Sequence, residues 1–416
     1  MSDGSELTRR DFLKGAAATA AAVALALEMD SRRAHAQGDA ISVGVIGTGV
    51  QGRILLAELT KLPGAKVIAY ADVYPASRKK AGDIAGGVTA YEDHRAMLDQ
   101  EKALQAVVIA TPTGLHAAMA IEAMKAGKHV FCEAPMANTI EDCKAMIRAA
   151  KETGKVLAIG HQRRSSPLYK HAFAFTKTGL IGKLVQARAQ NDRNQSWRKA
   201  VPDPANEQLL NWRLYQASSG GLMTEFGSHA LDAINWFAKS TPLSVMGNGG
   251  IDIWQDGREV ADNVQVIYEY PGGIKVAFSS TLGNSYGAAY ELFEGNSGTI
   301  WLSRESKGWL FKEAEAVRRG WEELAHKERI GDDEAIVLSA TATRLLKPEE
   351  VDKVRAEEAQ TDWYRELQDF IACIAENKEP ACTGMDGLRA VVAAAKANEA
   401  IASGTKLKFT EDLLAV

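Results

Sequence analysis

The stretch ISVGVIGTGVQGRILLAEL, residues 41–59, decides the fold of this chain. A short apolar run comes first, the pattern Gly-x-Gly-x-x-Gly follows at once, and helical periodicity comes after it. We expect Gly47 to make the tight turn, Gly49 to let a pyrophosphate approach the backbone, and Gly52 to let the helix pack closely on the strand. The sequence therefore predicts a dinucleotide-binding unit, whose loop also contains Thr48, Val50 and Gln51.

The next predicted strand, residues 67–71, ends in an acidic residue. Asp72 is placed to bind the ribose 2′-hydroxyl of the cofactor. An acid here favours NAD over NADP, because a 2′-phosphate would meet a negative charge. Arg78 follows closely in the sequence and moderates this preference, so NADP is the less favoured alternative.

Strands and helices continue to alternate up to residue 160, which predicts a doubly wound parallel sheet in a domain spanning residues 37–163. Ligands of such sheets bind beyond the carboxyl ends of the strands. Four candidate cofactor contacts follow predicted strands, namely Thr111, Pro112, His116 and Glu133. The last strand of the domain, residues 156–159, leads into two candidate substrate contacts, His161 and Arg163.

Beyond residue 165 the pattern changes to segments of β type with hairpin signals such as Pro271-Gly272-Gly273. We therefore expect a second α/β domain, residues 164–416, built on a mostly antiparallel sheet. Its expected strands are 184–190, 243–251, 264–270, 274–282 and 299–302. Residues 304–360 are rich in Glu, Lys, Arg and Ala, with helical spacing in 312–325 and 347–358, and predict a helical insertion. It is interpreted as a solvated excursion over the sheet, or as a substrate lid or subunit contact.

The amino terminus has the pattern of an export signal. Arg9-Arg10 precedes an alanine-rich apolar stretch, and Ala34-His35-Ala36 has the small-x-small form of a cleavage site. The apolar stretch, 15–27, is shorter than the ~20 residues of a membrane-spanning helix. We expect residues 1–36 to be a twin-arginine signal peptide that directs the chain to the periplasm or the exterior, with no membrane contact after cleavage.

Composition excludes several other classes of protein. A net charge of −4 gives no reason to expect nucleic acid or anionic membrane as a partner. The four cysteines show no metal-type spacing, so no metal site is expected and buried thiols are the interpretation.

One predicted helix in the second domain carries titratable groups on a single face. Glu225, His229 and Asp232 are spaced i, i+4 and i+7 and would share that face on an α-helix. Two carboxylates and an imidazole among apolar neighbours are costly to bury without a task or partners. The alternative interpretation is a helix cap with a salt-bridge cluster.

Five motifs together carry a resemblance to a known family. They are GTGVQG, ATPTGLH, GKHVFCEAP, GGLMTEFGSH and PACTGMDGL. In this combination the chain resembles the glucose-fructose oxidoreductase, inositol dehydrogenase and MocA (Gfo/Idh/MocA) family. The resemblance implies an NAD(P)-dependent oxidoreductase with a Rossmann domain followed by an α/β domain whose sheet is open and mostly antiparallel. It also implies sugar or cyclitol substrates, and dimers or tetramers formed through the outer face of that sheet.

Two departures from the family pattern affect the expected chemistry. The family has Glu-Lys-Pro at the strand end, and here Ala134 replaces the lysine that helps to move the substrate proton. The family has an aspartate before Gly-x-His, and here it is Glu225. His229 becomes the leading acid/base candidate, and Glu225 would orient it or act as the base itself. Possible substitutes for the lost ammonium are His161, Lys199, Arg163 and Tyr215.

Aromatic residues before the predicted helix that carries His229 are candidate sugar contacts, since aromatic rings stack on sugar faces. Trp212 and Tyr215 are favoured, with Trp197 as a further candidate, and a place in the core or in an interface is the alternative for each. Arg213, between Trp212 and Tyr215, is expected to reach the cofactor or a substrate hydroxyl.

Export and a nicotinamide site together constrain the reaction. Twin-arginine export carries folded proteins, so a tightly bound NAD can travel with the enzyme, whereas free NAD is scarce outside the cytoplasm. Three hypotheses follow. The first is an NAD-retaining oxidoreductase in a closed cycle, acting on a ring hydroxyl of a sugar, cyclitol or glycoside. The second is a glycosidase, lyase or epimerase that uses transient oxidation. The third is a carbohydrate-binding homologue without catalysis.

Overall fold

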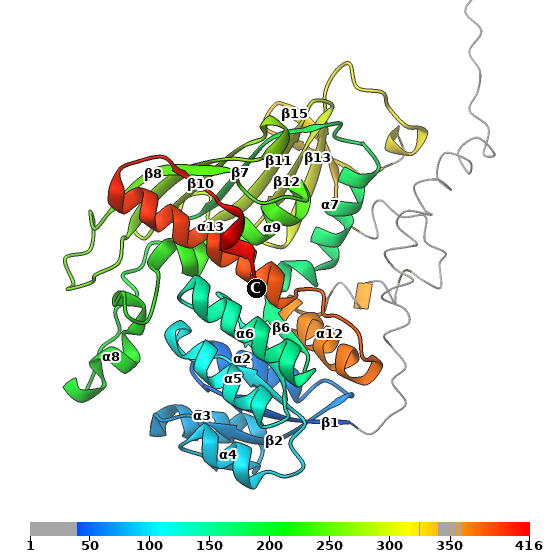
Figure 1. The fold of residues 1–416 in the computed structure, drawn as a ribbon. Coiled ribbons are helices and arrows are strands. Elements are labelled where there is room, and N and C mark those ends of the chain that lie inside the picture. Colours follow the sequence, from blue (N-terminus) through cyan, green and yellow to red (C-terminus); the bar gives the residue numbers. More distant parts are fainter. Residues whose placement is uncertain (1–39, 324, 340–350, 352–354, 357–358) are drawn as a thin grey trace, which may run out of the picture.

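The protein is described by a computed structural model, which covers residues 40–323, 325–339, 351, 355–356 and 359–416. Two sheets stand one above the other, with helices between and around them (Figure 1). Among the described residues, no helix has the length and apolar character that crossing a membrane requires.

The lower sheet in Figure 1 is the predicted parallel sheet. Within the described part of the chain it has six strands in the order β3-β2-β1-β4-β5-β6. The strands are β1 (Ile41–Ile46), β2 (Ala65–Ala71), β3 (Thr89–Tyr91), β4 (Ala106–Ile109), β5 (His129–Glu133) and β6 (Leu157–Gly160). The helices α2 (Val50–Leu59), α3 (Pro75–Ala85), α4 (His94–Gln100), α5 (His116–Lys125) and α6 (Ile140–Thr153) connect them. Since the chain order reverses between β1 and β4, the carboxyl ends of these two strands form the topological switch point where such sheets bind ligands.

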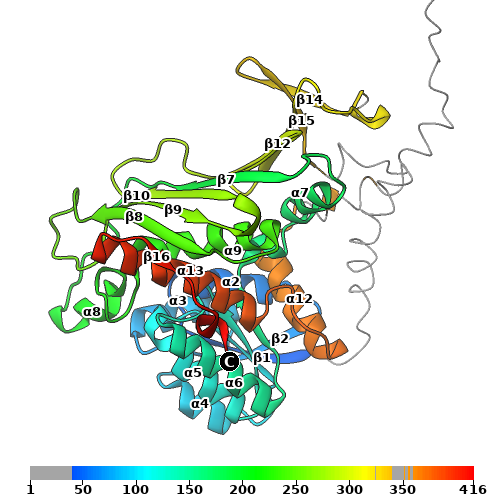
Figure 2. The same cartoon turned by 45° about the horizontal axis from the view of Figure 1, so that its top comes forward.

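The upper sheet is the predicted second sheet and is larger than expected. Its order over the described residues is β14-β15-β13-β12-β11-β7-β10-β9-β8-β16, and β7 and β10 are parallel while the other pairs are antiparallel. The predicted strands are found as β7 (Leu184–Asn191), β8 (Ser244–Gly250), β9 (Asn263–Glu269), β10 (Lys275–Thr281) and β12 (Gly298–Ser303). The sequence prediction missed β11 (Ala289–Gly295) and β16 (Leu407–Lys408). Helices α7 (Pro167–Lys177), α9 (Ser228–Ala238) and α13 (Gly384–Ser403) cover one face of this sheet (Figure 2).

The helical insertion predicted over residues 304–360 is wrong for its first half. Residues 307–312 form β13 and pair with β12, and a hairpin of β14 (Lys327–Ile330) and β15 (Asp333–Val337) continues the sheet. Trp309 and Leu310 are buried against that sheet, so tertiary pairing overrides the helical propensity of the composition. Most of the predicted helix at 347–358 lies outside the described residues.

The two sheets share helices from the end of the chain. Leu367 and Phe370 of α12 (Asp362–Glu376) pack in the core of the parallel sheet. Helix α13 contributes Leu388 to the other core of that sheet and Ala397 to the core of the antiparallel sheet. The boundary expected after residue 163 therefore separates the sheets, but the nucleotide-binding half also needs residues 362–403.

Candidate active site

The three glycines of the loop occupy three different environments, as the sequence predicts. Gly47 has φ +84°, and a Cβ there would lie 2.7 Å from the carbonyl oxygen of Ala110. A Cβ on Gly52 would lie 1.8 Å from the Gly47 carbonyl oxygen, so only glycine lets α2 pack at this distance from the turn. A Cβ on Gly49 would meet nothing within 4 Å. The protein therefore leaves open space above Gly49, at the amino end of a helix, which fits a dinucleotide pyrophosphate.

Asp72 follows β2 and is tied to the loop. Its Oδ2 accepts a hydrogen bond from the Thr48 amide at 2.7 Å, and its Oδ1 accepts one from the Tyr74 amide at 2.8 Å. Arg78 donates to the Asp72 carbonyl oxygen at 2.5 Å, and its guanidinium lies 3.4 Å from the Glu92 carboxylate. Glu92 therefore offsets part of the positive charge of Arg78.

The polar side chains after β4 differ in whether they have hydrogen-bond partners. The hydroxyl oxygen of Thr111 is buried and makes no hydrogen bond with the described residues. Pro112 leads directly into the short helix Thr113–Leu115. His116 is 1% exposed, and its two ring nitrogens lie 3.0 Å from the carbonyl oxygens of Pro135 and Thr111. The ring of His116 thus ties the ends of two strands together, and its expected contact with the cofactor stays a prediction.

Glu133 ends β5 and is linked to the glycine loop. Its Oε1 accepts a hydrogen bond from the Gln51 side chain at 2.7 Å, and its Oε2 accepts one from the Ala134 amide at 3.0 Å. Gln51, a predicted cofactor contact, therefore holds the Glu133 carboxylate in place. Burial raises the pKa of Glu133 to about 7, against the opposing effects of these hydrogen bonds and of the Arg213 charge.

Two imidazoles lie together beyond the ends of the parallel strands. The rings of His161, after β6, and His229, on α9, are 5.1 Å apart and meet edge to face. Both ring nitrogens of His161 and the Nδ1 of His229 are buried without a hydrogen bond to the described residues. Burial is the main cause that lowers each pKa to about 3, and the Arg163 charge contributes to both shifts. Both imidazoles are therefore neutral at physiological pH, and each has one nitrogen that can accept a hydrogen bond.

Glu225, which was expected to orient His229 or to act as the base itself, makes its hydrogen bonds within the described residues to Arg213, Thr113 and Ser219. Residues 223–227 form a π-helical turn, which rotates Glu225 away from the face that carries His229. The Glu225 carboxylate accepts hydrogen bonds from Arg213 Nε at 2.9 Å and from the hydroxyls of Thr113 and Ser219, each at 3.2 Å. With both oxygens occupied, Glu225 fixes Arg213.

Arg213 lies over its neighbour Trp212, with the guanidinium carbon 4.3 Å from the ring centroid. The Arg213 side chain is 40% exposed, so a ligand can reach it. Tyr215 donates its hydroxyl proton to Glu207 at 2.8 Å. Trp197 packs edge to face on Phe226, 5.4 Å between centroids, and belongs to the core of the second sheet, which is the alternative stated for it above.

Arg163, a predicted substrate contact, is held by two carboxylates, and its contact with substrate stays a prediction. Its guanidinium is 2% exposed and lies between Glu291, 2.6 Å away, and Glu305, 2.9 Å away. Gln162 also donates to Glu305, at 3.2 Å. Glu305 is the residue that sequence reasoning missed. It lies on the turn between β12 and β13, and no motif connects it with the histidines.

Asp232 is also held by cations. Arg164 forms a bidentate pair with it, with Nε 2.8 Å from Oδ2 and Nη2 2.8 Å from Oδ1. Arg164 also lies 3.2 Å from Asp386 at the start of α13. The salt-bridge interpretation stated as the alternative therefore holds for Asp232, whereas the Nδ1 of His229 on the same helix makes no hydrogen bond with the described residues.

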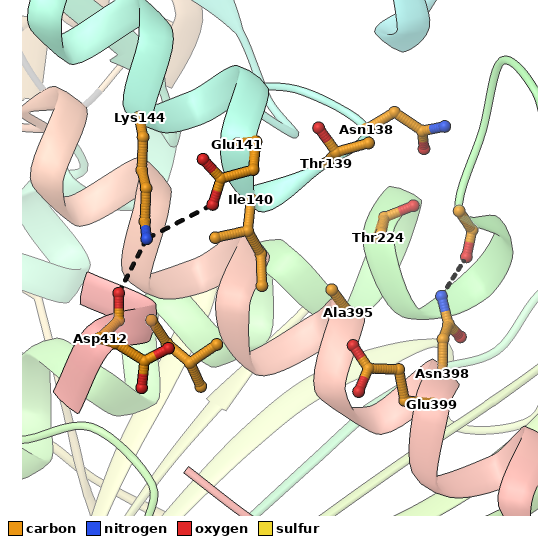
Figure 3. Close-up of a pocket in the computed structure, with 12 residues that line it drawn as sticks. Asn138, Thr139, Ile140, Glu141, Lys144, Thr224, Ala395, Asn398, Glu399 and Asp412 are labelled. Carbon is orange, nitrogen blue, oxygen red and sulfur yellow. Dashed lines mark hydrogen bonds and ion pairs between the residues drawn. The ribbon is translucent and has the colours of Figure 1, made fainter. Parts of the chain in front are cut away.

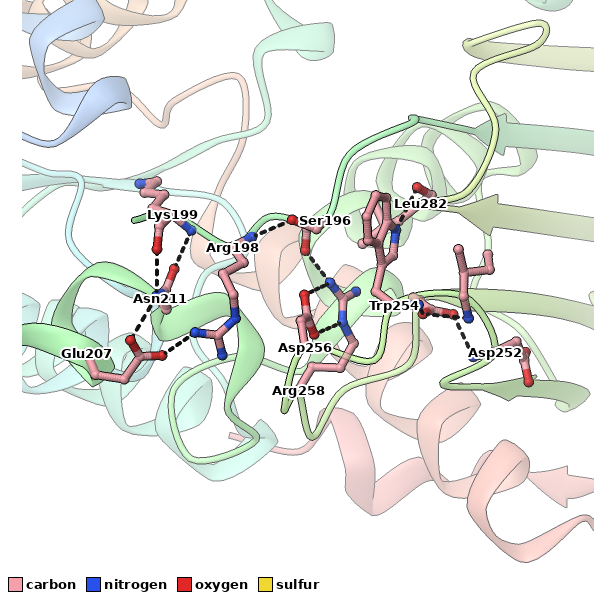
Figure 4. Close-up of polar contacts among 12 residues, drawn as sticks. Ser196, Arg198, Lys199, Glu207, Asn211, Asp252, Trp254, Asp256, Arg258 and Leu282 are labelled. Atoms are coloured by element: carbon pink, nitrogen blue, oxygen red, sulfur yellow. Dashed lines mark hydrogen bonds and ion pairs between the residues drawn. The ribbon is translucent and has the colours of Figure 1, made fainter. Parts of the chain in front are cut away.

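Lys199 lies on the loop after β7, where Asn211 bonds to both its backbone amide and its carbonyl (Figure 4). Its ammonium makes no ion pair within the described residues. Partial burial, followed by the charges of Arg213 and Arg53, lowers the pKa of Lys199. Since those arginines flank the cofactor cradle, Lys199 belongs to the same cationic rim and stays a candidate for the missing ammonium.

A cavity of about 460 Å³ lies on the other side of the π-helical turn (Figure 3). Its walls include Thr139, Lys144, Thr224 and Asn398, and it contains none of the predicted site residues. Thr224 lines this cavity while the adjacent Glu225 faces the cofactor side. Within the described residues, no group of three His, Cys, Asp or Glu side chains is arranged to hold a metal ion.

The buried imidazoles predict a loss of stability in acid. Because the pKa of His161 is about 3 in the folded protein and about 6.5 when unfolded, the unfolded chain binds more protons between these values. Stability therefore falls as the pH falls through this window, by about 2 kcal/mol for His161 at pH 5. Urea unfolding gives the free energy of unfolding at pH 7 and at pH 5. The decrease between these two pH values should be about 2 kcal/mol smaller in His161→Asn than in the parent. His326→Asn, at an exposed histidine, is the control, and equal losses in parent and His161→Asn would contradict the assignment.

Comparison with known proteins agrees with this geometry. Residues 41–161 match the family described as "Oxidoreductase family, NAD-binding Rossmann fold", and residues 169–302 match its "GFO/IDH/MocA C-terminal domain". Residues 6–26 match the signal sequence of the twin-arginine translocation pathway.

Relatives with an assigned activity match about two thirds of the chain. A levoglucosan dehydrogenase of Pseudarthrobacter phenanthrenivorans is 28% identical over 318 residues, covering 68% of this chain and 79% of the relative. A 2,7-anhydro-N-acetylneuraminate hydratase of Escherichia coli is 26% identical, covering 65% and 70%. A structure of levoglucosan dehydrogenase with NADH and levoglucosan superimposes with a TM-score of 0.72 at 21% identity, over 89% of this chain and 99% of the other. The chain thus belongs to the Gfo/Idh/MocA family of NAD(P)-dependent oxidoreductases and carries a twin-arginine signal.

Proposed function

We propose that this protein is an exported oxidoreductase that retains NAD and acts on a ring hydroxyl of a sugar, cyclitol or glycoside in a closed redox cycle. One observation carries the proposal. Two neutral imidazoles, the buried His161 and the half-buried His229 of α9, lie together beyond the carboxyl ends of the nucleotide-binding strands, where Ala134 supplies no ammonium. Such a pair can accept a hydrogen bond from a ring hydroxyl, and bound ligands would have to raise the low pKa of His229 for it to take the proton.

Each residue has a stated part in this reaction. When bound, the nicotinamide accepts a hydride from the substrate carbon. His229 takes the hydroxyl proton, and His161 packs against it and shares the hydroxyl. Arg213, fixed by Glu225, reaches over Trp212 toward the ligand. Tyr215 lies at the rim with its hydroxyl bound to Glu207.

NAD is the proposed cofactor, and tight binding is part of the proposal. Asp72 faces the ribose position, and Arg78 is already engaged by Glu92 and the backbone. An enzyme that leaves the cytoplasm folded can carry NAD with it, and a closed cycle needs no external recycling. We place the mature protein in the periplasm or outside the cell, after passage through the twin-arginine machinery.

The second sheet has an exposed face that suits a second copy of the chain. Met246 and Ile267 are paired across β8 and β9 and are 50% and 53% exposed. Adjacent exposed apolar side chains on a sheet favour association. We therefore propose a homodimer or homotetramer formed through this face.

Transient oxidation is the second candidate function. The relative named as a hydratase of an anhydro sugar acid supports it, because water addition is not a net redox reaction. Oxidising one ring carbon makes the neighbouring C–H acidic, so that a group can leave or invert before the hydride returns. The absence of lysine at position 134 fits such a rerouted cycle.

The test begins with protein purified from the exported fraction without added NAD. Nicotinamide absorbance that travels with the protein supports retention. Hydride exchange between two sugars supports the first function, while release of an aryl leaving group with unchanged cofactor supports the second. A protein that binds sugars but never a nicotinamide would instead be a carbohydrate-binding homologue.

A lysine at position 134 should create an ordinary dehydrogenase. In Ala134→Lys the ammonium would join the strand end beside Glu133 and supply the family's proton-handling group. We expect NAD-linked oxidation of single sugars with added NAD, measured as NADH formation. Ala134→Met, of similar length without charge, is the matched control. Equal activity in both variants and the parent would mean that the proton already leaves through other residues.

A further inference from the structure

A long connection joins β7 to the π-helical turn, and the active site described above uses only part of it. Residues 192–222 contain the short helices Pro204–Asn206, α8 (Glu207–Leu210) and Trp212–Leu214, and α8 stands out from the two sheets (Figure 1). A connection of this length within a compact domain usually has a function. We call residues 196–219 the β7 lobe.

Side chains within the β7 lobe tie it into one unit. Asn211 is 1% exposed, and its side chain accepts a hydrogen bond from the Lys199 amide at 2.7 Å and donates to the Lys199 carbonyl oxygen at 3.1 Å. It also donates to the Glu207 carboxylate at 3.2 Å. Glu207 accepts further hydrogen bonds from Arg198 and from the Tyr215 hydroxyl, each at 2.8 Å. Because these bonds join the two halves of the lobe, we expect it to move as one body.

The end of the β7 lobe rests on the nucleotide-binding sheet. The Gly114 amide, after β4, donates to the Ser218 carbonyl oxygen at 3.2 Å, and a Cβ on Gly114 would lie 3.2 Å from the Ala217 carbonyl oxygen. The Asn138 side chain, after β5, donates to the Gln216 carbonyl oxygen at 3.2 Å. Both contacts lie at the carboxyl edge of the parallel strands, so the lobe covers part of the edge where such sheets bind ligands.

The start of the β7 lobe has an unusual backbone conformation. Trp197 has φ +67°, in the left-handed region that a bulky side chain rarely adopts. Its ring packs on Phe226, and Arg258 donates a hydrogen bond to the carbonyl oxygen of Ser196. Strained residues persist where the surrounding structure holds them, and they are common at ligand clamps. The turn at Trp197 sets the direction of the chain just before Lys199.

The ammonium of Lys199 is a cation without an acidic partner. It makes no ion pair within the described residues, whereas the adjacent Arg198 is paired with Glu207. The Lys199 side chain is exposed and points away from the hydrogen bonds that its backbone makes (Figure 4). The lobe therefore presents a positive charge that its own carboxylates do not neutralise.

A second cation lies at the glycine loop. The Arg53 amide donates to the Gly49 carbonyl oxygen at 3.2 Å, and the Arg53 guanidinium donates to the Thr48 carbonyl oxygen at 2.7 Å. Arg53 also makes no ion pair among the residues that the structure describes. Its charge and that of Arg213 both act on Lys199, which agrees with an ammonium that faces the loop. Two cations that repel each other across this space suit a ligand with two negative charges, such as a diphosphate.

Resting on the proposed cofactor site, we propose that the β7 lobe clamps the diphosphate of the dinucleotide, with Lys199 pairing with it from the lobe and Arg53 from α2. The open space at Gly49 admits the diphosphate, and the lobe, held at Gly114 and Asn138, hinders its exit. Release requires the whole lobe to lift, so a cofactor bound before export dissociates slowly. In this role Lys199 is a binding residue and not the substitute for the ammonium that Ala134 lacks.

Calorimetric titration with ADP-ribose tests the clamp on the full exported protein, dialysed free of cofactor. ADP-ribose contains the diphosphate but no nicotinamide, so it takes no part in hydride transfer. We expect Lys199→Met to weaken the binding of ADP-ribose and of NAD alike by about tenfold, a usual loss for one hydrogen bond to a charged group. Added salt should weaken binding to the parent more than binding to this variant.

Lys183→Met is the matched control. Lys183 is exposed and directly precedes β7, so this variant removes the same charge at the other end of the strand. It should bind ADP-ribose as the parent does. An equal loss in both variants would overturn the clamp, since the effect would then be one of net charge.

Two further outcomes separate the clamp from the proposed function. An unchanged affinity for ADP-ribose in Lys199→Met would overturn the clamp and leave the proposed function intact, and a lower turnover in that variant would then assign Lys199 to proton transfer. A parent that binds neither NAD nor ADP-ribose would overturn the proposed function, and the clamp with it.

Hydrogen exchange tests the β7 lobe as a unit. Amides of residues 196–219 should exchange more slowly once ADP-ribose binds the parent, and unchanged exchange would overturn the clamp. Asn211→Ala removes the bonds that join the lobe without changing its charge. We expect this variant to release NAD about tenfold faster than the parent when excess ADP-ribose displaces it. Unchanged release in a variant with the parent's Tm would show that the lobe does not control dissociation.

Discussion

Replacing His229 with alanine is expected to lower kcat about 10²–10⁴-fold, the usual share of a proton-transfer group. Its Nδ1 makes no hydrogen bond with the described residues, so the substitution breaks no polar contact of that atom. The Tm and the affinity for NAD should therefore stay near the parent values. Turnover, substrate KM and cofactor binding, measured together, distinguish a catalytic His229 from one that only binds substrate.

The exposed His326 supplies the control for this variant, since His326→Ala changes the same kind of side chain far from any buried site. An increase in KM with kcat unchanged would make His229 a binding residue. A large loss of Tm would make it structural. Either result would move the acid/base role to His161 or Lys199.

Alanine at Gly49 and at Gly52 should give opposite patterns of damage. In Gly49→Ala the new Cβ meets no protein atom within 4 Å, so the Tm should be unchanged while NAD binding is lost. In Gly52→Ala the Cβ would lie 1.8 Å from the Gly47 carbonyl oxygen, so α2 must move off the turn. Overpacking of this kind costs about 1–3 kcal/mol or more, and we expect both Tm and NAD binding to fall.

Thermal unfolding and calorimetric titration with NAD check this pair of variants. Gly86, which ends α3 in open space, gives a third variant, Gly86→Asn, that keeps the left-handed conformation and should match the parent. If Gly49→Ala still binds NAD as the parent does, the pyrophosphate does not lie over this loop.

The parallel sheet could be predicted because its information is local. The glycine pattern, the strand before it and the acid that follows β2 all lie within about thirty residues. Each of them has one physical explanation, the binding of a dinucleotide. The insertion was predicted wrongly because its charged composition favours a helix, while Trp309 and Leu310 pair with a strand that composition does not reveal.

The site was predicted less completely, and the reasons are geometric. Glu225 was expected to lie on one face with His229, but a π-helical turn between them changes that face, and no residue type signals such a turn. Arg163 was expected to contact a ligand, but its partners Glu291, on β11, and Glu305, on the β12–β13 turn, lie more than 120 residues away in the sequence.

The shared helices α12 and α13 have a consequence for how the chain is made. The ribosome completes the strands of the nucleotide-binding sheet by residue 160, but Leu367, Phe370 and Leu388, which fill its cores, are synthesised about 200 residues later. Contacts of such long sequence separation form slowly. The nucleotide-binding half therefore cannot finish folding during translation, and its twin-arginine signal emerges long before there is a finished molecule to export. A pathway that transports only folded proteins suits a chain whose nucleotide-binding half finishes folding only after α13 has been synthesised.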